Sequence, residues 1–256
     1  MKKTLALLLA AVMLLSVLAA CSSKAETPAE PEQTTEEPAQ TPDAPAEETT
    51  EETTAAEEPS QEELDQAAAD EVAAMIDAIY VQTRTNETDA QCEAAKAAWD
   101  ALTDAQKALV EGDEASPDYF GLDTGDASKD DPRNQDDIGE NELLVVSFGT
   151  SFNDSRVADI KGIEEALQEA NPDWSVRRAF TAQIIINHIQ ARDGEKIDNM
   201  TQALDRAVAN GVKNLVVQPT HLMHGAEYDE MCEALEQYKD KFESVAIAEP
   251  MLGEVG

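Results

Sequence analysis

The chain has 256 residues and a formal net charge of −36 at pH 7, with a sequence pI near 4.1. Proteins that bind nucleic acid through its phosphates need clustered Lys and Arg, so this charge balance excludes nucleic acid as a partner. The length is sufficient for more than one structural unit.

The N-terminus has the organisation of an export signal. Lys2 and Lys3 precede an apolar run from Leu5 to Ala20, and small residues lead into Cys21, which is the pattern of a bacterial lipoprotein signal peptide. The apolar run falls short of the ~20 residues that cross a bilayer core, which favours lipidation over a transmembrane helix. We therefore expect a signal peptide over residues 1–21, lipidation of Cys21, and an extracytoplasmic protein tethered to the cell membrane.

Residues 22–59 are expected to form a disordered acidic linker. Between Ala25 and Pro59 the chain contains only Glu, Asp, Thr, Pro, Ala and Gln. This composition cannot bury enough apolar surface to offset the entropy of ordering, and its like charges extend the chain. A metal-scavenging acidic tail is the alternative, although isolated carboxylates on a mobile chain hold divalent ions poorly.

Residues 60–111 are predicted to form a small helical module. In three places a Ser or Thr precedes Glu or Gln by three residues, a pattern that caps helix starts; the pairs are Ser60 with Glu63, Thr88 with Gln91, and Thr103 with Gln106. Apolar residues such as Val72 and Trp99 recur at helical spacing. We find no set of catalytic residue types in the sequence of this module, and we expect a stalk or docking role for it.

Residues 112–141 are rich in Asp, Gly, Asn and Pro, and we expect them to form a connector. Cys92 and Cys232 lie in helical patterns, which favours partly buried free thiols over a disulfide. The spacing of the cysteines does not indicate a zinc site.

From residue 142 to residue 256 the pattern changes to strands that alternate with helices. Strands are expected over residues 143–146, 175–179, 214–219 and 244–248, and helices over residues 154–170, 181–192, 200–210 and 227–239. Such alternation specifies a doubly wound parallel sheet, an α/β fold. Ligands in these folds bind at the carboxyl ends of the strands, which directs attention to the loops that follow Val146 and Pro219.

Four blocks in this region resemble the anaerobic sirohydrochlorin cobaltochelatase family. They are Leu143 to Ser151, Arg178 to Thr181, Gln190 to Gly194 and His221 to Tyr228. The resemblance implies a lyase that inserts cobalt(2+), as substrate metal, into a tetrapyrrole during anaerobic cobalamin biosynthesis. It covers the N-terminal half of the family's domain, and the family's other metal-binding histidines lie in the second half. We therefore expect a truncated domain, and the alternative is that a second chain supplies the rest. A homo-oligomer is a further candidate assembly.

Metal insertion needs a base for the pyrrole protons and ligands that release the ion to the ring, and cobalt accepts mixed imidazole and carboxylate donors. The resemblance assigns a metal-ligand role to Glu227, at a helix start that favours an ionised carboxylate; a simple helix cap is the alternative. His221 is the candidate catalytic residue, or else a histidine bonded to backbone. His224 is a candidate metal or haem ligand, or else a solvated loop residue.

The substrate is expected to contact the small-residue loop after the first strand, at Ser147, Gly149, Thr150 and Ser151. Backbone amides near a helix start can meet carboxylates, and Arg178 is the candidate counter-charge. A serine hydrolase is excluded because the chain lacks the Gly-x-Ser-x-Gly elbow.

A second class of function stays open from the sequence. Corrinoid intermediates are made in the cytoplasm, so an export signal favours a non-catalytic lipoprotein that binds metal, haem, iron or another tetrapyrrole at the cell surface.

Overall fold

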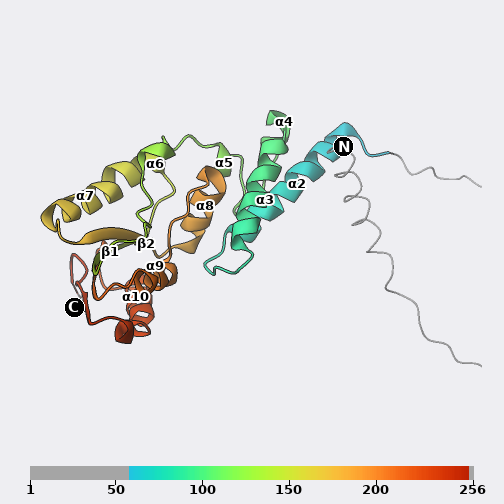
Figure 1. The fold of residues 1–256 in the computed structure, drawn as a ribbon. Coiled ribbons are helices and arrows are strands. Elements are labelled where there is room, and N and C mark those ends of the chain that lie inside the picture. Colours follow the sequence, from blue (N-terminus) through green and yellow to red (C-terminus); the bar gives the residue numbers. More distant parts are fainter. Residues whose placement is uncertain (1–57, 254–256) are drawn as a thin grey trace, which may run out of the picture. The chain divides into compact units, whose positions relative to one another are not determined.

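The computed structural model describes residues 58–253, which belong to one compact unit. Figure 1 draws these residues in colour. The predicted signal peptide, the lipidation site Cys21 and nearly all of the acidic linker lie outside the described residues. Between residues 58 and 253, no helix combines the length and apolar character that a membrane span requires.

A parallel sheet of four strands, in the order β2-β1-β3-β4, organises the C-terminal region. The strands are β1 (Asn141–Ser147), β2 (Ser175–Phe180), β3 (Asn214–Pro219) and β4 (Ser244–Ile247). The central strand β1 pairs with β2 on one side and β3 on the other, and β3 pairs with β4. This arrangement confirms the predicted α/β fold, and it places the carboxyl ends of β1, β2 and β3 at one edge of the sheet (Figure 1).

Helices cover both faces of the sheet, as a doubly wound fold requires. They are α6 (Asn153–Ser155), α7 (Lys161–Ala170), α8 (Gln183–Asp193), α9 (Met200–Ala209) and α10 (Ala226–Glu236), with a short 3-10 turn over Lys239–Lys241. Leu144 and Val146 of β1 pack with α9 and α10, whereas Val145 packs on the opposite face with Leu167 of α7. The alternating side chains of β1 therefore supply both cores.

The predicted helix over residues 154–170 differs from the observed one at its start. Asn153 begins the helix, Asp154 provides no cap, and the stretch Arg156–Ile160 is π-helical before α7 continues it. The π-helical stretch contains Arg156, whose side chain is fully buried.

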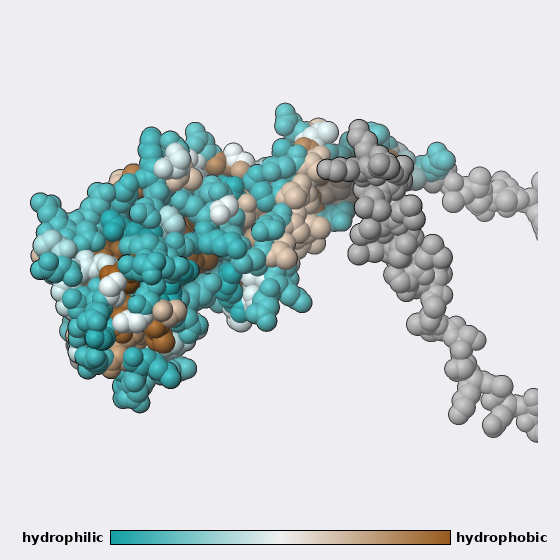
Figure 2. Space-filling model, viewed as in Figure 1, coloured by the Kyte–Doolittle hydropathy of each residue, from teal (hydrophilic) through white to brown (hydrophobic). Residues whose placement is uncertain are grey.

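The N-terminal helices are α2 (Gln61–Ile79), α3 (Thr88–Ala101) and α4 (Asp104–Lys107). Capping boxes form at Ser60 and Thr103 as predicted. The expected box at Thr88 is wrong, because Thr88 is buried and its hydroxyl accepts the backbone N–H of Thr85 at 2.9 Å. Figure 2 shows a moderately hydrophobic surface, coloured tan, over α2 and α3, whereas hydrophilic residues cover most of the rest of this face.

These helices share a core with α8 of the α/β region. Ala191 of α8 belongs to the apolar cluster of α2 and α3, and the thiol of Cys92 donates to the carbonyl of Asn187 at 3.5 Å. Cys92 and Cys232 are both free, as predicted. Helix α8 therefore joins the helical segment to the sheet.

The segment predicted as a connector also packs into the core. It holds the short helix α5 (Asp118–Gly121) and a 3-10 turn over Ala127–Lys129. Tyr119 stacks on His188 of α8 with ring centroids 4.2 Å apart, and Phe120 meets Trp99 edge-on at 5.8 Å. These aromatic contacts extend the core between α3 and α8.

Candidate functional site

The carboxyl ends of the strands are tied together by hydrogen bonds. The backbone N–H of Thr181, after β2, donates to the carbonyl of Ser147 at 2.9 Å. The hydroxyl of Thr220, after β3, donates to Oγ of Ser147 at 2.9 Å. Ser147 is itself buried at the end of β1. In the structure, Ser147 connects the loops that follow β1, β2 and β3 through these hydrogen bonds. Its contact with the substrate stays a prediction.

The loop after β1 is shaped by close approach to Phe180. Gly149 has φ +102°, and a Cβ atom at this position would lie 2.5 Å from the Phe180 ring, so only glycine fits. The hydroxyl of Thr150 accepts the N–H of Phe152 at 3.2 Å, and the carbonyl of Ser151 accepts Nη2 of Arg192 at 2.6 Å. The predicted loop residues thus lie at the sheet edge in a fixed conformation.

A pocket of about 220 Å³ opens beside this loop. Its lining residues come from the loops after β1 and β2, the start of α10 and the loop between α2 and α3; they are Gln82, Phe148, Thr181, Ala182, Ala226, Glu227 and Glu230. Glu227 lies exposed in the first turn of α10, where it was predicted. The hydroxyl of Thr181 is buried and has no hydrogen-bond partner among the described residues. The pocket therefore combines carboxylate acceptors with an unused hydroxyl.

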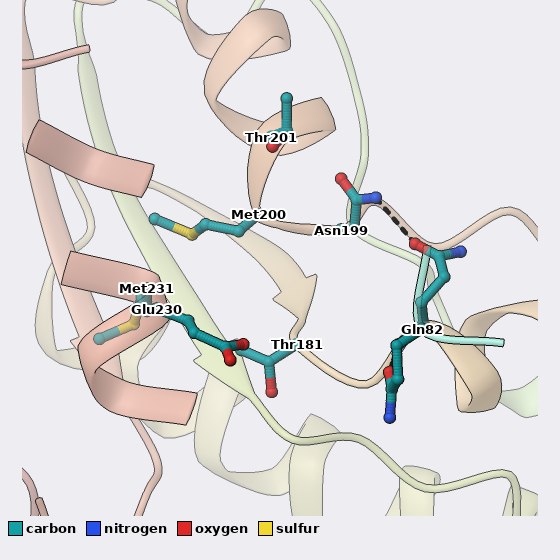
Figure 3. A pocket seen from close by; sticks show the side chains of 8 residues that line it. Gln82, Thr181, Asn199, Met200, Thr201, Glu230 and Met231 are labelled. Atoms are coloured by element: carbon teal, nitrogen blue, oxygen red, sulfur yellow. Dashed lines mark hydrogen bonds between the residues drawn. The ribbon is translucent and has the colours of Figure 1, made fainter. Parts of the chain in front are cut away.

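A second pocket of about 180 Å³ shares Gln82, Thr181 and Glu230 with the first. Figure 3 shows these three side chains entering it from different elements, with Met200 and Met231 on its apolar side. The two pockets therefore form adjoining parts of one polar depression at the sheet edge.

His221 follows β3 as predicted and is half-buried, and neither ring nitrogen has a partner among the described residues. Burial lowers the pKa of His221, and the negative charge of Glu227 opposes that effect. A neutral imidazole with two unused nitrogens can accept a proton or bind a metal ion.

His224 is more exposed and contacts other residues of its own loop and helix. Its Nδ1 lies 3.4 Å from Oδ1 of Asp229, and its ring tilts against Tyr228 at 4.5 Å. The loop around both histidines is held by the last described residues, since Met251 and Leu252 donate backbone hydrogen bonds to the carbonyls of His221 and Leu222.

Within residues 58–253, no group of three or more His, Cys, Asp or Glu side chains is arranged to hold a metal ion. Glu227 and the two histidines lie along one loop and helix start, but they do not form a closed set of ligands. Such an open arrangement suits transient binding of a metal ion better than a structural metal site, because a structural site is closed by its protein ligands.

Arg178 lies away from this site, contrary to the prediction. Its fully buried guanidinium donates to Asp130 at 2.6 and 2.9 Å and to Glu164 at 2.7 and 2.8 Å. The sequence did not reveal these partners, because Asp130 lies in the segment interpreted as a connector. Arg178 stabilises the interior and has no free surface for a substrate carboxylate.

Exposed apolar side chains surround the strand ends. Phe148 and Phe152 flank the loop after β1 with 44% and 50% of their surface exposed, and Leu222 and Met223 follow β3 with 57% and 50%. Apolar side chains that stay exposed beside a polar pocket are suited to contact a flat, apolar ligand face.

Sequence reasoning did not identify three pocket residues: Gln82, Thr181 and Glu230. Thr181 ends one of the blocks that carry the family resemblance, so its position after β2 was a usable signal. Gln82 lies in the loop between α2 and α3, outside those blocks, and only the tertiary packing brings it to the sheet edge.

Comparisons with known proteins identify the family that this region resembles. Residues 141–256 match the family model "Cobalt chelatase (CbiK)". A sirohydrochlorin cobaltochelatase of Salmonella typhimurium is 36% identical over 110 residues, covering 43% of this chain and 42% of the relative. The sirohydrochlorin cobaltochelatase CbiKC of Nitratidesulfovibrio vulgaris is 28% identical over 116 residues, covering 44% of this chain and 40% of the relative.

The chain thus spans less than half the length of the curated relatives that it matches. The matched segment begins with β1 and contains all four strands of the sheet, both loop histidines and every residue of the strand-end pocket except Gln82. On this evidence, residues 141–256 form a segment that is similar to the cobalt chelatase family.

Proposed function

We propose that this protein acts in the insertion of cobalt into sirohydrochlorin, a step of anaerobic cobalamin biosynthesis. The observation that carries the proposal is the position of Glu227, which lies in the strand-end pocket of a segment that is similar to the cobalt chelatase family. Cobalt is the substrate metal in this reaction, and the tetrapyrrole is the second substrate.

The proposed chemistry assigns separate tasks to the residues of the pocket. The Glu227 carboxylate binds cobalt as an exposed ligand and releases it to the ring nitrogens, which complete the coordination as the pyrrole N–H protons leave. His221 accepts one of the two pyrrole protons, because burial lowers its pKa and keeps the imidazole neutral, and the other proton leaves to water. Phe148 packs against the ring face.

The loop from Gly149 to Ser151 supports the substrate in this proposal. Its conformation is fixed by the Gly149 approach to Phe180 and by the bond from Arg192 to the Ser151 carbonyl. A fixed loop beside the ring avoids the entropy cost of ordering a mobile loop on binding.

A non-catalytic binding function is the second candidate. The export-signal pattern before Cys21 favours it, because the protein would then meet metal, haem, iron or a tetrapyrrole outside the cytoplasm. In this function His224, which is exposed, would be an additional ligand. We further propose that a lipid on Cys21 anchors the protein to the cell membrane, and that the acidic linker separates the folded unit from the bilayer.

Cobalt insertion by the full chain tests the first proposal. Sirohydrochlorin is incubated with Co²⁺ and the protein, and the change in its absorption spectrum is followed against a control without protein. Protein-dependent insertion is expected. Tight binding of sirohydrochlorin or haem without any acceleration of insertion would overturn the chelatase function and support the binding function.

A further inference from the structure

The loop between α2 and α3 reaches the strand-end pocket, although it lies outside the segment that matches the chelatase family. Gln82 in this loop lines both of the adjoining pockets described above, including the one that contains Glu227. The family match begins at residue 141. The helical segment therefore adds a side chain to a site whose other parts lie in the matched segment.

One hydrogen bond fixes the position of Gln82. Its Oε1 accepts the backbone N–H of Gln183, the first residue of α8, at 3.1 Å. The residue before this helix, Ala182, offers no side-chain cap, so Gln82 satisfies a helix-start donor from a position 101 residues earlier. The hydrogen bond directs the side chain of Gln82, an exposed residue, toward the start of α8 beside the pocket.

The polarity of this contact decides what Gln82 offers to a ligand. Oε1 already accepts one hydrogen bond from Gln183, and the Nε2 amide, which can only donate, is the group that remains available as a donor to a ligand. The hydroxyl of Thr181 is buried in the wall of the same pocket without a partner among residues 58–253, and the Glu227 and Glu230 carboxylates of the pocket are acceptors. Among the side chains of the pocket, the Gln82 amide is therefore the donor that can meet an acceptor on a ligand.

We propose that Gln82 is a specificity-determining residue that donates an amide N–H to a peripheral carboxylate of the tetrapyrrole. This inference rests on the proposed function, since it assumes that the strand-end pocket holds the macrocycle. The ring nitrogens are directed at the metal, so the carboxylate arms are the acceptors that remain at the edge of such a molecule. The helical segment thereby takes part in substrate selection.

Three variants of the full chain separate this role from a purely structural one. Gln82→Glu keeps an oxygen that can accept the Gln183 N–H but replaces the amide donor with a negative charge. Gln82→Met removes both the acceptor and the donor at similar size. Gln91→Glu is the matched control, because it makes the same charge change on an exposed position of the same helical segment.

The measurement is the Kd of metal-free sirohydrochlorin, followed by fluorescence, together with the thermal unfolding midpoint of each variant. We expect Gln82→Met to raise the Kd by roughly 10-fold, in keeping with the loss of a hydrogen bond to a charged group, and Gln82→Glu to raise it further, because it adds a negative charge. Gln91→Glu should leave the Kd unchanged. The midpoint should fall most in Gln82→Met, which loses the helix cap.

The proposal predicts that Gln82→Glu binds sirohydrochlorin more weakly than Gln82→Met does. If the residue served only as a cap, Gln82→Met would bind more weakly than Gln82→Glu, and that order would overturn the proposal. Unchanged or tighter binding in Gln82→Glu would also overturn it. Failure of the wild-type chain to bind sirohydrochlorin would instead overturn the proposed function on which the inference rests, and the two failures are therefore distinguishable.

Discussion

The side-chain amide of Asn187 donates a hydrogen bond of 2.8 Å to the carbonyl oxygen of Ile79, the last residue of α2. Asn187 is fully buried in α8, and its own Oδ1 accepts Nε2 of Gln183 at 2.8 Å. The side chain of Asn187 therefore hydrogen-bonds both the last carbonyl of α2 and the side chain of Gln183, the first residue of α8. This bond links the N-terminal helices to the α/β region.

Asn187→Ala should destabilise the protein by about 2–3 kcal/mol, because it leaves the Ile79 carbonyl and the Gln183 amide buried without partners. Urea unfolding with tryptophan fluorescence measures the effect, since Trp99 and Trp174 report on the two regions. The exposed Asn86→Ala change should stay within about 0.5 kcal/mol of wild type. A loss equally small for Asn187→Ala would show that the two regions do not depend on this bond.

Asp130→Asn should be more costly, about 3–5 kcal/mol, because Asp130 neutralises the buried guanidinium groups of Arg156 and Arg178. Asp136→Asn provides the control, since the Asp136 side chain is 66% exposed in its pair with Arg206. That change should cost less than about 1 kcal/mol. Calorimetric unfolding midpoints compare the two variants, and equal midpoints would contradict the structural role of Asp130.

The contrast between these positions shows what the sequence could predict. Strand and helix alternation after Glu142 predicted the parallel sheet, because buried parallel strands are short apolar runs. The partners of Arg178 could not be predicted, since Asp130 belongs to a polar segment whose burial depends on the tertiary fold. The position of Glu227 followed from its place at a helix start after the third predicted strand, whereas the contribution of Gln82 to the pocket depends on tertiary packing.

His188 should make stability depend on pH. Burial against Tyr119 lowers the pKa of His188 to about 4, whereas an unfolded histidine titrates near 6.5. The stabilising effect of the neutral ring is complete above about pH 6.5, and it is lost as pH falls toward about 4, because the unfolded chain binds the proton first.

His188→Phe keeps the aromatic packing and removes this titration. Between about pH 7 and about pH 5, the wild type should lose roughly 2 kcal/mol more stability than the variant. Denaturant unfolding at the two pH values measures the difference. Parallel losses in both proteins would mean that His188 does not remain neutral in the folded state.

Glu227→Gln should lower cobalt insertion at least ~10-fold, the scale that accompanies loss of a metal ligand or its support. The exposed Glu233→Gln change on the same helix is the matched control and should insert cobalt at the wild-type rate. His224→Ala should also leave insertion nearly unchanged, although it should weaken haem binding if the non-catalytic function holds. Insertion rates from absorption spectra decide the matter, and full activity in Glu227→Gln would remove that residue from the mechanism.

Cys21→Ser should release the protein from the membrane fraction, because the thiol of Cys21 is the proposed attachment point of the lipid. Detergent partitioning of cell extracts, followed by immunodetection, measures the distribution. Retention of the variant in the detergent phase would favour an uncleaved apolar segment as the anchor and would contradict lipidation.

The outer side of β2 is already occupied, although this strand lies at an edge of the sheet. The N–H groups of Val176, Arg178 and Phe180 donate to the Gln168 side chain, the Arg133 carbonyl and the Asp198 carbonyl. An unpaired strand edge offers a template on which another chain can add a strand and start aggregation. Here the segment before β1 and the loop before α9 remove that template, so the protein is protected on this side from sheet extension at high concentration.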